Sequence, residues 1–532
     1  MPKITIREND YTIPGLEGET NFSVVVPGFR RFKYIEDLKQ SELPTDDLIN
    51  SPFDCNGIYE VKNPNDFLSK VGPVPVTDVA ITVTEAGETS TYIFNSYGNQ
   101  IAYELLNLGY TVLYIDLGIL DPEGTEFDSS KFVKLIKEDS PILEPLKDKV
   151  SYDFRFIISG LKVGTAGTPA VLDGTRKIYN RVSQEITKLA SFKEADLNTV
   201  IATTDGAYSL GKSIRGDCTA LVDIDDSVYS DGSLSSFDII KQIQLNANTL
   251  CKGLNEGHSK TTVDHGKYLG LFAPSIIFDS LASSTASITK KVGSQDVTYD
   301  YRYSANPDLV AKSVNMKLPA YFYYLVCFSH SIRDLDYAEW YAAAGLTRGK
   351  GVLKPVASTI NLGEIAINLL EPRYKLEIAG EGSGDEHVYF KNAVNVITKV
   401  RSSYVLWGNR TAYELGTKDE DDGDLVASHF MNIRQLCTTL KKEIYQACKK
   451  FTFDPNSDVL WVNFCNTIRP TLESMKANQG IENYAIEKIP VEQKATLKAR
   501  VRIVPIEAVE DFDIEVALED SITGETTATV LE

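Results

Sequence analysis

The chain has 532 residues and a formal net charge of −20, with 43% hydrophobic and 24% charged residues. This composition is typical of an ordinary globular protein with enough chain for about two to four domains. The acidic balance argues against a nucleic-acid binder, whose phosphate contacts need a basic surface. No apolar run approaches the roughly 18 residues of a membrane span. We also expect no direct membrane insertion and no secretory signal in the first ten residues, MPKITIREND, so that synthesis takes place in the cytoplasm.

The first 20 residues predict an arm and not a folded unit. They hold one short alternation, Ile4 and Ile6, and too few apolar side chains to form a core, so the arm must dock on another surface. Residues 22–120 then alternate between strand and helix patterns, which predicts an α/β sheet covered by helices. The expected strands are Phe22–Val26, Val79–Val83 and Tyr110–Leu117, and the expected helices are Asp66–Val71 and Gln100–Leu108.

The middle of the chain continues this pattern around two irregular segments. Residues 121–153 are polar and contain three prolines, which predicts an excursion from the sheet, and residues 283–300 predict an exposed hairpin. The expected strands are Phe154–Ser159, Val200–Thr203, Ala220–Ile224, Leu269–Phe272 and Ile276–Phe278, and the expected helices are Arg176–Ala190, Phe237–Gly253 and Pro319–Arg333.

The C-terminal third contains the clearest helix, Asn432–Phe451. Its apolar residues form one stripe, and Lys442 and Lys449 lie on the opposite, exposed face. A second helix is expected to begin near Pro470, because proline favours the first helical turn, and to stop at Gly480.

Two strand patterns follow in the tail. The first, Leu497–Ile503, places Val501 and Ile503 on one face and basic residues on the other. The second alternates acidic residues with an apolar face formed by Phe512, Ile514, Val516 and Leu518. Opposite charges across a sheet attract, so the two strands are suited to pairing. The pattern leaves open whether they pair within one chain or with another copy.

Chemistry-bearing motifs are weak. Gly206 to Ser213 fits the phosphate-loop pattern GxxxxGK[ST], with Lys212 and Ser213 as the functional residues, but Gly216 and a strand pattern follow where a helix is required. His258 and His265 flank Asp264 without a trusted metal-ligand spacing. Seven cysteines form no CxxC pair, and we expect them to be reduced. The sequence therefore predicts no catalytic, cofactor or metal site.

Several co-linear segments resemble one family. They include Leu318-Pro-Ala-Tyr321 through Gly351, Asn392-Ala-Val-Asn395, Val405-Leu-Trp-Gly-Asn-Arg-Thr411, Asn432-Ile-Arg434 and Phe451-Thr-Phe-Asp-Pro-Asn456. Together they are similar to the tail sheath proteins of contractile bacteriophages and related contractile injection systems. The Trp-Gly-Asn-Arg-Thr segment is the most specific, and the likeness is strongest from about residue 318 to 518.

This resemblance implies a multi-domain α/β subunit with mixed sheets. It implies an N-terminal arm at 1–20, outer domains at 21–350 with variable excursions near 121–153 and 281–306, and an inner domain at 351–532. Arms at both ends would exchange strands between subunits through Ile4, Ile6 and either Leu497–Ile503 or Phe512–Leu518, the final acidic strand being favoured.

The resemblance also implies a structural role without a cofactor. Subunits would form hexameric rings stacked around a tail tube and contract to drive it through a target envelope. Expected partners are other copies, the tube protein (with Lys442 and Lys449 as candidate contacts), and baseplate and neck proteins, all within a virion. Two alternatives remain: another virion or surface lattice protein, and a nucleotide hydrolase that uses Lys212 and Ser213.

Overall fold

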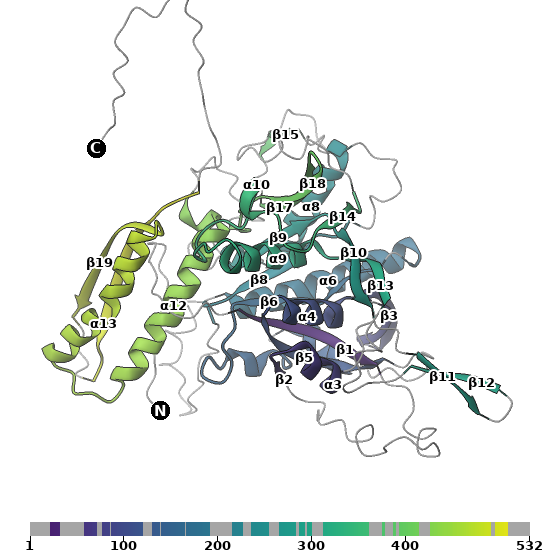
Figure 1. Ribbon diagram of the computed structural model, residues 1–532, viewed down its shortest axis with the longest axis horizontal. Coiled ribbons are helices and arrows are strands. Elements are labelled where there is room, and N and C mark those ends of the chain that lie inside the picture. Colours follow the sequence, from purple (N-terminus) through teal and green to yellow (C-terminus); the bar gives the residue numbers. More distant parts are fainter. Residues whose placement is uncertain are drawn as a thin grey trace, which may run out of the picture.

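The computed structural model places the chain around one large mixed sheet (Figure 1). Its strand order is β18-β17-β9-β8-β6-β1-β5-β2. The central strands run parallel, while β2 and β18 pair antiparallel at the two edges. The strands are β1 Ser23–Arg31, β2 Ile58–Val61, β5 Thr111–Leu120, β6 Phe156–Ile158, β8 Thr219–Asp223, β9 Leu269–Ala273, β17 Val394–Val400 and β18 Ser403–Trp407.

The structure describes residues 22–31, 58–71, 77–85, 87–120, 130–138, 140–164, 166–191, 215–226, 236–254, 265–283, 287–292, 295–300, 312–360, 375–377, 387–389, 393–413, 426–490 and 495–508.

Helices cover both faces of the large sheet because its strands are apolar on both sides. In β1, Val25 packs into a core with α5, α6 and α8, whereas Val24 and Val26 pack into a second core with α3, α4 and α9. These six helices are α3 Pro64–Lys70, α4 Gly98–Asn107, α5 Ser130–Ile136, α6 Pro169–Ala190, α8 Ser236–Leu254 and α9 Ala320–Arg333.

Shorter elements surround this core. One three-stranded sheet contains β3 Thr77–Glu85, β4 Glu88–Ser96 and β7 Leu161–Val163, and another contains β10 Ile276–Ser283, β13 Lys312–Leu318 and β14 Pro355–Ser358. Two strand pairs are β11 Ser287–Val292 with β12 Gln295–Asp300, and β15 Lys375–Glu377 with β16 His387–Tyr389. The short helices are η1 Glu144–Lys147, η4 His265–Tyr268, α10 Gly345–Arg348 and η6 Ala427–His429.

The C-terminal elements form a separate layer beside the sheet body (Figure 1). This layer consists of α12 Met431–Phe451, α13 Asp458–Ala477, β19 Ile481–Ile489 and β20 Lys498–Pro505. The two strands form an antiparallel ribbon that packs on α12 and α13. We call β19 and β20 together the terminal ribbon.

The mixed α/β fold class predicted from the sequence is confirmed, as are the expected helices and strands that fall within the described residues, apart from three differences. The first strand, expected at Phe22–Val26, does not end there but continues to Arg31 through an irregularity between Gly28 and Arg30. The expected strand at Val200–Thr203 lies outside the described residues.

The second difference concerns the segment 121–153, which is not simply an excursion. Within its described part, Phe132 and Leu135 of α5 and Leu146 of η1 are completely buried in the core shared with α6 and α8. Prolines break regular structure in this segment without removing its apolar residues from the core, so composition alone was misleading.

The third difference is the start of α13. The helix begins at Asp458, where the side chain of Ser457 accepts a hydrogen bond from the Leu460 backbone N–H, and Pro470 lies inside it. Proline removes one helical hydrogen bond, but here it lies on the exposed face, where water can satisfy the freed carbonyl. The buried stripe of α13, which includes Ile468 and Leu472, keeps the helix continuous.

The large sheet combines strands from both sides of residue 350, the predicted boundary between outer and inner domains. The parallel pairing of Val394 with Leu271 joins β17 to β9 across that boundary. The predicted domain limits remain a prediction.

Candidate assembly interface

The terminal ribbon has one apolar face and one charged face. Tyr484 lies opposite Ile503, and Ile486 lies opposite Val501, and these residues pack toward the helices. Val501 and Ile503 are each only 6% exposed. The other face of β20 carries three exposed cations, Lys498, Arg500 and Arg502. The alternation predicted for this strand is therefore confirmed, and its apolar side chains belong to the core of the chain's own C-terminal layer.

Each strand of the ribbon has an edge with no strand beside it in the described part of the chain. β19 pairs with β20 in an antiparallel register from Ile481 opposite Pro505 to Ile489 opposite Lys498, and the sheet contains these two strands alone. Backbone N–H and C=O groups along an open edge are ready to pair with a further strand. The ribbon is therefore a rigid, helix-supported platform with two edges suited to strand addition.

The other residues predicted for strand exchange cannot be located. Ile4 and Ile6, and the tail residues Phe512, Ile514, Val516 and Leu518, lie outside the described residues. Past β20, the backbone N–H of Ile506 donates to the Gly480 carbonyl at 3.1 Å, which directs the chain along the end of the ribbon.

The two lysines predicted on one exposed face of α12 differ. The Lys442 ammonium pairs with the Asp153 carboxylate and donates to the Phe154 carbonyl at 2.9 Å, and its side chain is 10% exposed. Lys449 is exposed, with its Nζ 4.8 Å from the centroid of the Tyr445 ring. Sequence periodicity did not reveal the Lys442 contact because Asp153 lies almost 290 residues away in the chain. The expectation of a shared exposed face therefore applies to Lys449 and not to Lys442.

The first half of α12 joins the C-terminal layer to the sheet body through buried polar groups. The Arg155 guanidinium donates to Thr439 Oγ1 at 2.7 Å and to Gln435 Oε1 at 3.3 Å, and Gln435 donates to Thr219 Oγ1 at 3.1 Å. Glu339 provides a carboxylate 3.8 Å from Arg155. Burial lowers the pKa of Arg155, and Glu339 opposes that effect. Such a hydrogen-bonded contact defines a specific orientation between the two parts.

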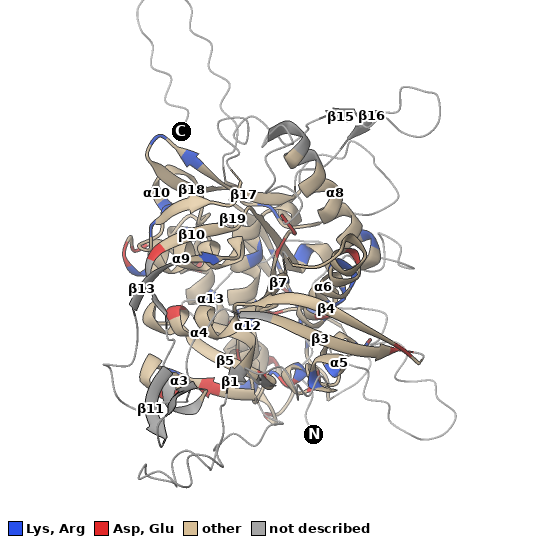
Figure 2. Ribbon diagram, turned by 90° about the vertical axis from the view of Figure 1, so that its right-hand side faces the viewer, with Lys and Arg blue, Asp and Glu red and all other residues tan. Residues whose placement is uncertain are grey.

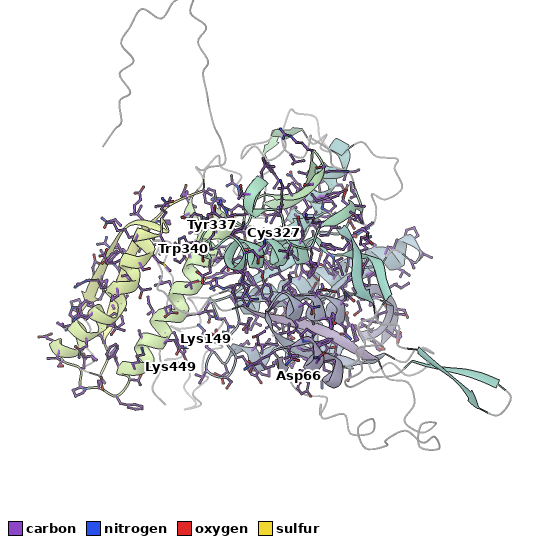
Figure 3. The ribbon with its side chains drawn as sticks, viewed as in Figure 1. Asp66, Lys149, Cys327, Tyr337, Trp340 and Lys449 are labelled. Carbon is purple, nitrogen blue, oxygen red and sulfur yellow. The ribbon has the colours of Figure 1, made fainter. Side chains whose placement is uncertain are left out.

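The Trp-Gly-Asn-Arg-Thr segment lies at this same junction. Asn409 Nδ2 donates to Asn432 Oδ1 at 2.7 Å, and the Asn432 backbone N–H donates to Asn409 Oδ1 at 3.1 Å. Asn432 Nδ2 also donates to the Trp340 carbonyl at 3.1 Å. Figure 3 labels Trp340 at the boundary between the sheet body and α12. Three segments that carry the family resemblance thus meet at one point.

A buried ionic cluster occupies the carboxyl ends of the parallel strands, where α/β proteins often bind ligands. The Lys162 ammonium lies 3.0 Å from Asp223 and 2.5 Å from Asp226, and it also donates to Ser275. Asp223 Oδ1 accepts from the backbone N–H of Ala320, the first residue of α9, at 2.8 Å. We call Lys162, Asp223 and Asp226 the lysine clasp. It connects β7, β8 and α9 by electrostatics and hydrogen bonds.

The carboxylates of the clasp have different pKa values. Burial raises the pKa of Asp223 to about 6 despite Lys162. Burial acts in the same direction on Asp226, but Lys162 and Lys317 together hold the pKa of Asp226 down to about 2. Burial disfavours the charged form of Lys162, yet the two carboxylates raise its pKa above the usual value. Side chains of the chain itself therefore supply the positive charge that opposes the two carboxylates: Lys162 for both, and Lys317 in addition for Asp226.

Within the described residues, the phosphate-loop and histidine motifs of the sequence do not form a catalytic site. The phosphate-loop match, with Lys212 and Ser213, lies outside the described residues, as does His258. His265 is buried, with its Nδ1 2.5 Å from Ser191 Oγ. Within the described ranges, no group of three or more His, Cys, Asp or Glu residues is arranged to hold a metal ion. In the same ranges, no helix is both long and apolar enough to cross a membrane.

No protein-family model and no curated protein matches the chain. Two solved structures are similar to it over nearly its whole length. One is the anti-feeding prophage baseplate, with 11% identity, a TM-score of 0.47, and coverage of 98% of this chain and 99% of that chain. The other is the PVC sheath complex of an extracellular contractile injection system in its contracted state, with 11% identity, a TM-score of 0.46, and coverage of 98% of each chain.

Proposed function

We propose that the chain is a sheath subunit that polymerises helically around a tail tube and contracts to drive the tube through a target envelope. The terminal ribbon is the observation that carries this proposal, because it offers two open strand edges on a scaffold of helices. The sequence supplies two segments with strand patterns to fill them, the Ile4–Ile6 arm and the Phe512–Leu518 tail. The co-linear motifs that resemble sheath proteins support the same conclusion.

Strand addition gives a physical basis for assembly. A donated strand gains backbone hydrogen bonds along an open edge, and its alternating side chains determine the register. Phe512, Ile514, Val516 and Leu518 would continue the apolar face formed by Val501 and Ile503. Each donated arm then links one copy to a neighbour without altering the core of either.

Contraction requires copies to reorient while they remain connected. The polar junction of Arg155 with Gln435 and Thr439 holds the terminal ribbon in a defined orientation to the sheet body. Reorientation would therefore occur in the segments that lead to the donated strands. The energy is stored in the packing of the lattice, which rearranges from one state to another, and no catalytic step is involved.

The proposed role as a sheath subunit determines which partners the chain would bind. Copies would form hexameric rings stacked into a sheath within a virion, assembled after synthesis in the host cytoplasm, with baseplate and neck proteins at its ends. Lys449 is the remaining candidate contact with the tube protein, since its side chain is exposed. No nucleic acid, membrane insertion or cofactor is part of the proposed function.

Electron microscopy of the purified full chain tests the proposal. We expect negatively stained tubes with helical striations, and we expect folded monomers after removal of residues 1–10 or 508–532. Normal-length tubes from either truncated chain would contradict strand exchange. A flat or closed lattice would favour another virion or surface protein, and nucleotide binding dependent on Lys212 would favour the hydrolase alternative.

A further inference from the structure

The outer face of the terminal ribbon carries an excess of positive charge. Its exposed cations, all on β20, are Lys498, Arg500 and Arg502. The β19 residues directly opposite these cations are Ile489, Glu487 and Ala485, so the register supplies one carboxylate for three cations. That carboxylate, Glu487, pairs with Arg502. Neither Lys498 nor Arg500 forms an ion pair with another residue in the described part of the chain.

This charged face lies on the outside of the molecule. Figure 1 shows β19 on the far side of α13 from the sheet body, and Figure 2, viewed from the side of β11 and β12, places the C-terminal layer behind that body. Within the described residues β20 pairs with β19 alone, so its other edge is open beside the cations. A strand added at this edge would extend both the charged outer face and the apolar inner face of the ribbon.

The tail beyond the ribbon has a matching pattern. The carboxylates on its polar side, spaced like the cations of β20 with Ala517 in the remaining position, are those of Asp511, Asp513, Glu515 and Glu519. Opposite charges directly across two strands attract, and like charges repel. At the β20 edge these carboxylates would meet Lys498 and Arg500, whereas at the β19 edge they would lie beside Glu487. The charges therefore distinguish the two open edges.

The last described residues leave the ribbon along the strand direction. The Ile506 backbone N–H donates to the Gly480 carbonyl at 3.1 Å, so the pairing with the β19 side continues just past β20. Burial raises the pKa of Glu507, and Arg410 of the sheet body is close enough to oppose that effect. This course leads toward the sheet body and not around the open edge of β20. It favours the ribbon of another copy as the acceptor of the tail.

We infer that the acidic tail strand 511–519 of one copy pairs with the open edge of β20 in a neighbouring copy, with its carboxylates beside Lys498 and Arg500. This inference rests on the proposed strand exchange and adds which edge accepts which segment. The apolar side of the tail joins the core that contains Val501, where Ile444 and Cys448 of α12 are only partly buried. The β19 edge is left for the Ile4–Ile6 arm.

Charge exchange in the full chain tests this assignment. The ribbon variant carries Lys498→Glu and Arg500→Glu, and the tail variant carries Asp513→Lys and Glu515→Lys. Each variant alone places like charges across the joint, so sedimentation at low salt should show assembly only at about tenfold higher concentration. A chain with all four changes should assemble like the unaltered chain. Failure of that chain to recover, with folding verified by circular dichroism, would overturn the inference.

A mixture of the two variants distinguishes exchange between copies from pairing within one chain. In the mixture, the acidic tail of the ribbon variant meets the basic ribbon of the tail variant, and the basic tail meets the acidic ribbon. We expect the equimolar mixture to assemble at the concentration of the unaltered chain. A mixture that assembles no better than either variant, while the chain with all four changes recovers, would assign the tail to its own ribbon.

The matched control is Lys450→Glu with Lys476→Glu. Both lysines are exposed on helices of the same layer, and the change in net charge equals that of the ribbon variant. The control should assemble normally, and an equal loss would attribute the effect to net charge and overturn the inference. The unaltered chain separates the two proposals. Monomers at all concentrations would contradict the proposed function together with the inference, whereas a ribbon variant that assembles normally would contradict the inference alone.

Discussion

Asn409 and Asn432 hold each other through two hydrogen bonds, of 2.7 and 3.1 Å, at the point where the sheet body meets α12. Both side chains are buried, and Asn432 also donates to the Trp340 carbonyl. A pair of amides in this geometry connects the residues that follow β18 to the start of α12. These polar groups act together with the apolar packing of Trp340 on Leu436 and Met475 to orient the C-terminal layer.

Asn432→Ala should reduce the free energy of unfolding by about 1–3 kcal/mol, because buried partners on Asn409 and Trp340 lose their hydrogen bonds. Chemical denaturation monitored by Trp fluorescence measures the loss. Asn463→Ala, on the exposed face of α13, is the control and should change stability by less than about 0.5 kcal/mol. Equal effects of the two substitutions would contradict a structural role for the Asn409–Asn432 pair.

Lys162→Met should destabilise the protein by about 3–5 kcal/mol, because it leaves the buried carboxylates of Asp223 and Asp226 without their cation. Lys177→Met removes a lysine whose side chain is 76% exposed and whose partner, Asp173, is also exposed. That control should change stability by less than about 0.5 kcal/mol. Thermal and denaturant unfolding of both variants provide the comparison, and a loss below about 1 kcal/mol for Lys162→Met would argue against the lysine clasp.

The lysine clasp also predicts how the free energy of unfolding depends on pH. The pKa of Asp223 is about 6 in the folded chain, against an ordinary value of 3.8, so the folded state binds the proton more tightly. Its contribution to stability is therefore largest below pH 3.8 and declines as the pH rises toward 6. Asp226, with a folded pKa of about 2, contributes stability above pH 3.8 that is lost as the pH falls toward 2.

The free energy of unfolding of Asp223→Asn, measured between pH 3.8 and 6 and between pH 3.8 and 2, tests that pH dependence. Asparagine keeps an oxygen that can accept from the Ala320 N–H but cannot titrate. We expect the decline between about pH 4 and 6 to disappear while the acid loss remains. Asp173→Asn, at an exposed carboxylate, should leave both windows as they are in the unaltered chain. An unchanged decline in Asp223→Asn would assign that titration to another group.

Phe453→Gly tests whether the exposed phenyl ring contributes to the stability of the monomer. Glycine adopts a φ of +79° without steric cost, and an 86% exposed phenyl ring contributes little to the folded monomer. We expect monomer stability to stay within about 1 kcal/mol of the unaltered chain. Chemical denaturation of dilute protein measures the difference. Stability reduced by more than about 2 kcal/mol would show that Phe453 serves the monomer core.

Sequence patterns predicted the large sheet well because its strands carry continuous apolar runs such as Val24, Val25 and Val26. They predicted the buried face of β20 for a different reason, the alternation of Val501 and Ile503 with basic residues. They did not predict β19, its partner. The register shift between Ile481 and Asn483 interrupts the alternation, so Tyr484 and Ile486 fall out of phase with Ile481.

Polar burial was the other feature that patterns could not predict. The stripe of α12 that includes Leu436 and Leu440 was expected, but Gln435 and Thr439 are buried as well. Their partner, Arg155, is about 280 residues distant in the chain, and no local pattern connects them. The exposure of Phe453 was also missed, because an isolated Phe in a polar loop has no periodicity that distinguishes an exposed residue from a core residue.

The lysine clasp has a consequence for a particle built from many copies. Its cation is a side chain, so every subunit contains one counter-charge for Asp223 and Asp226 through covalent connection. Dilution, chelating agents and a change of surrounding fluid cannot remove it. In many α/β proteins this edge of the sheet binds a diffusible ligand. Here the same lysine side chain occupies it in every copy.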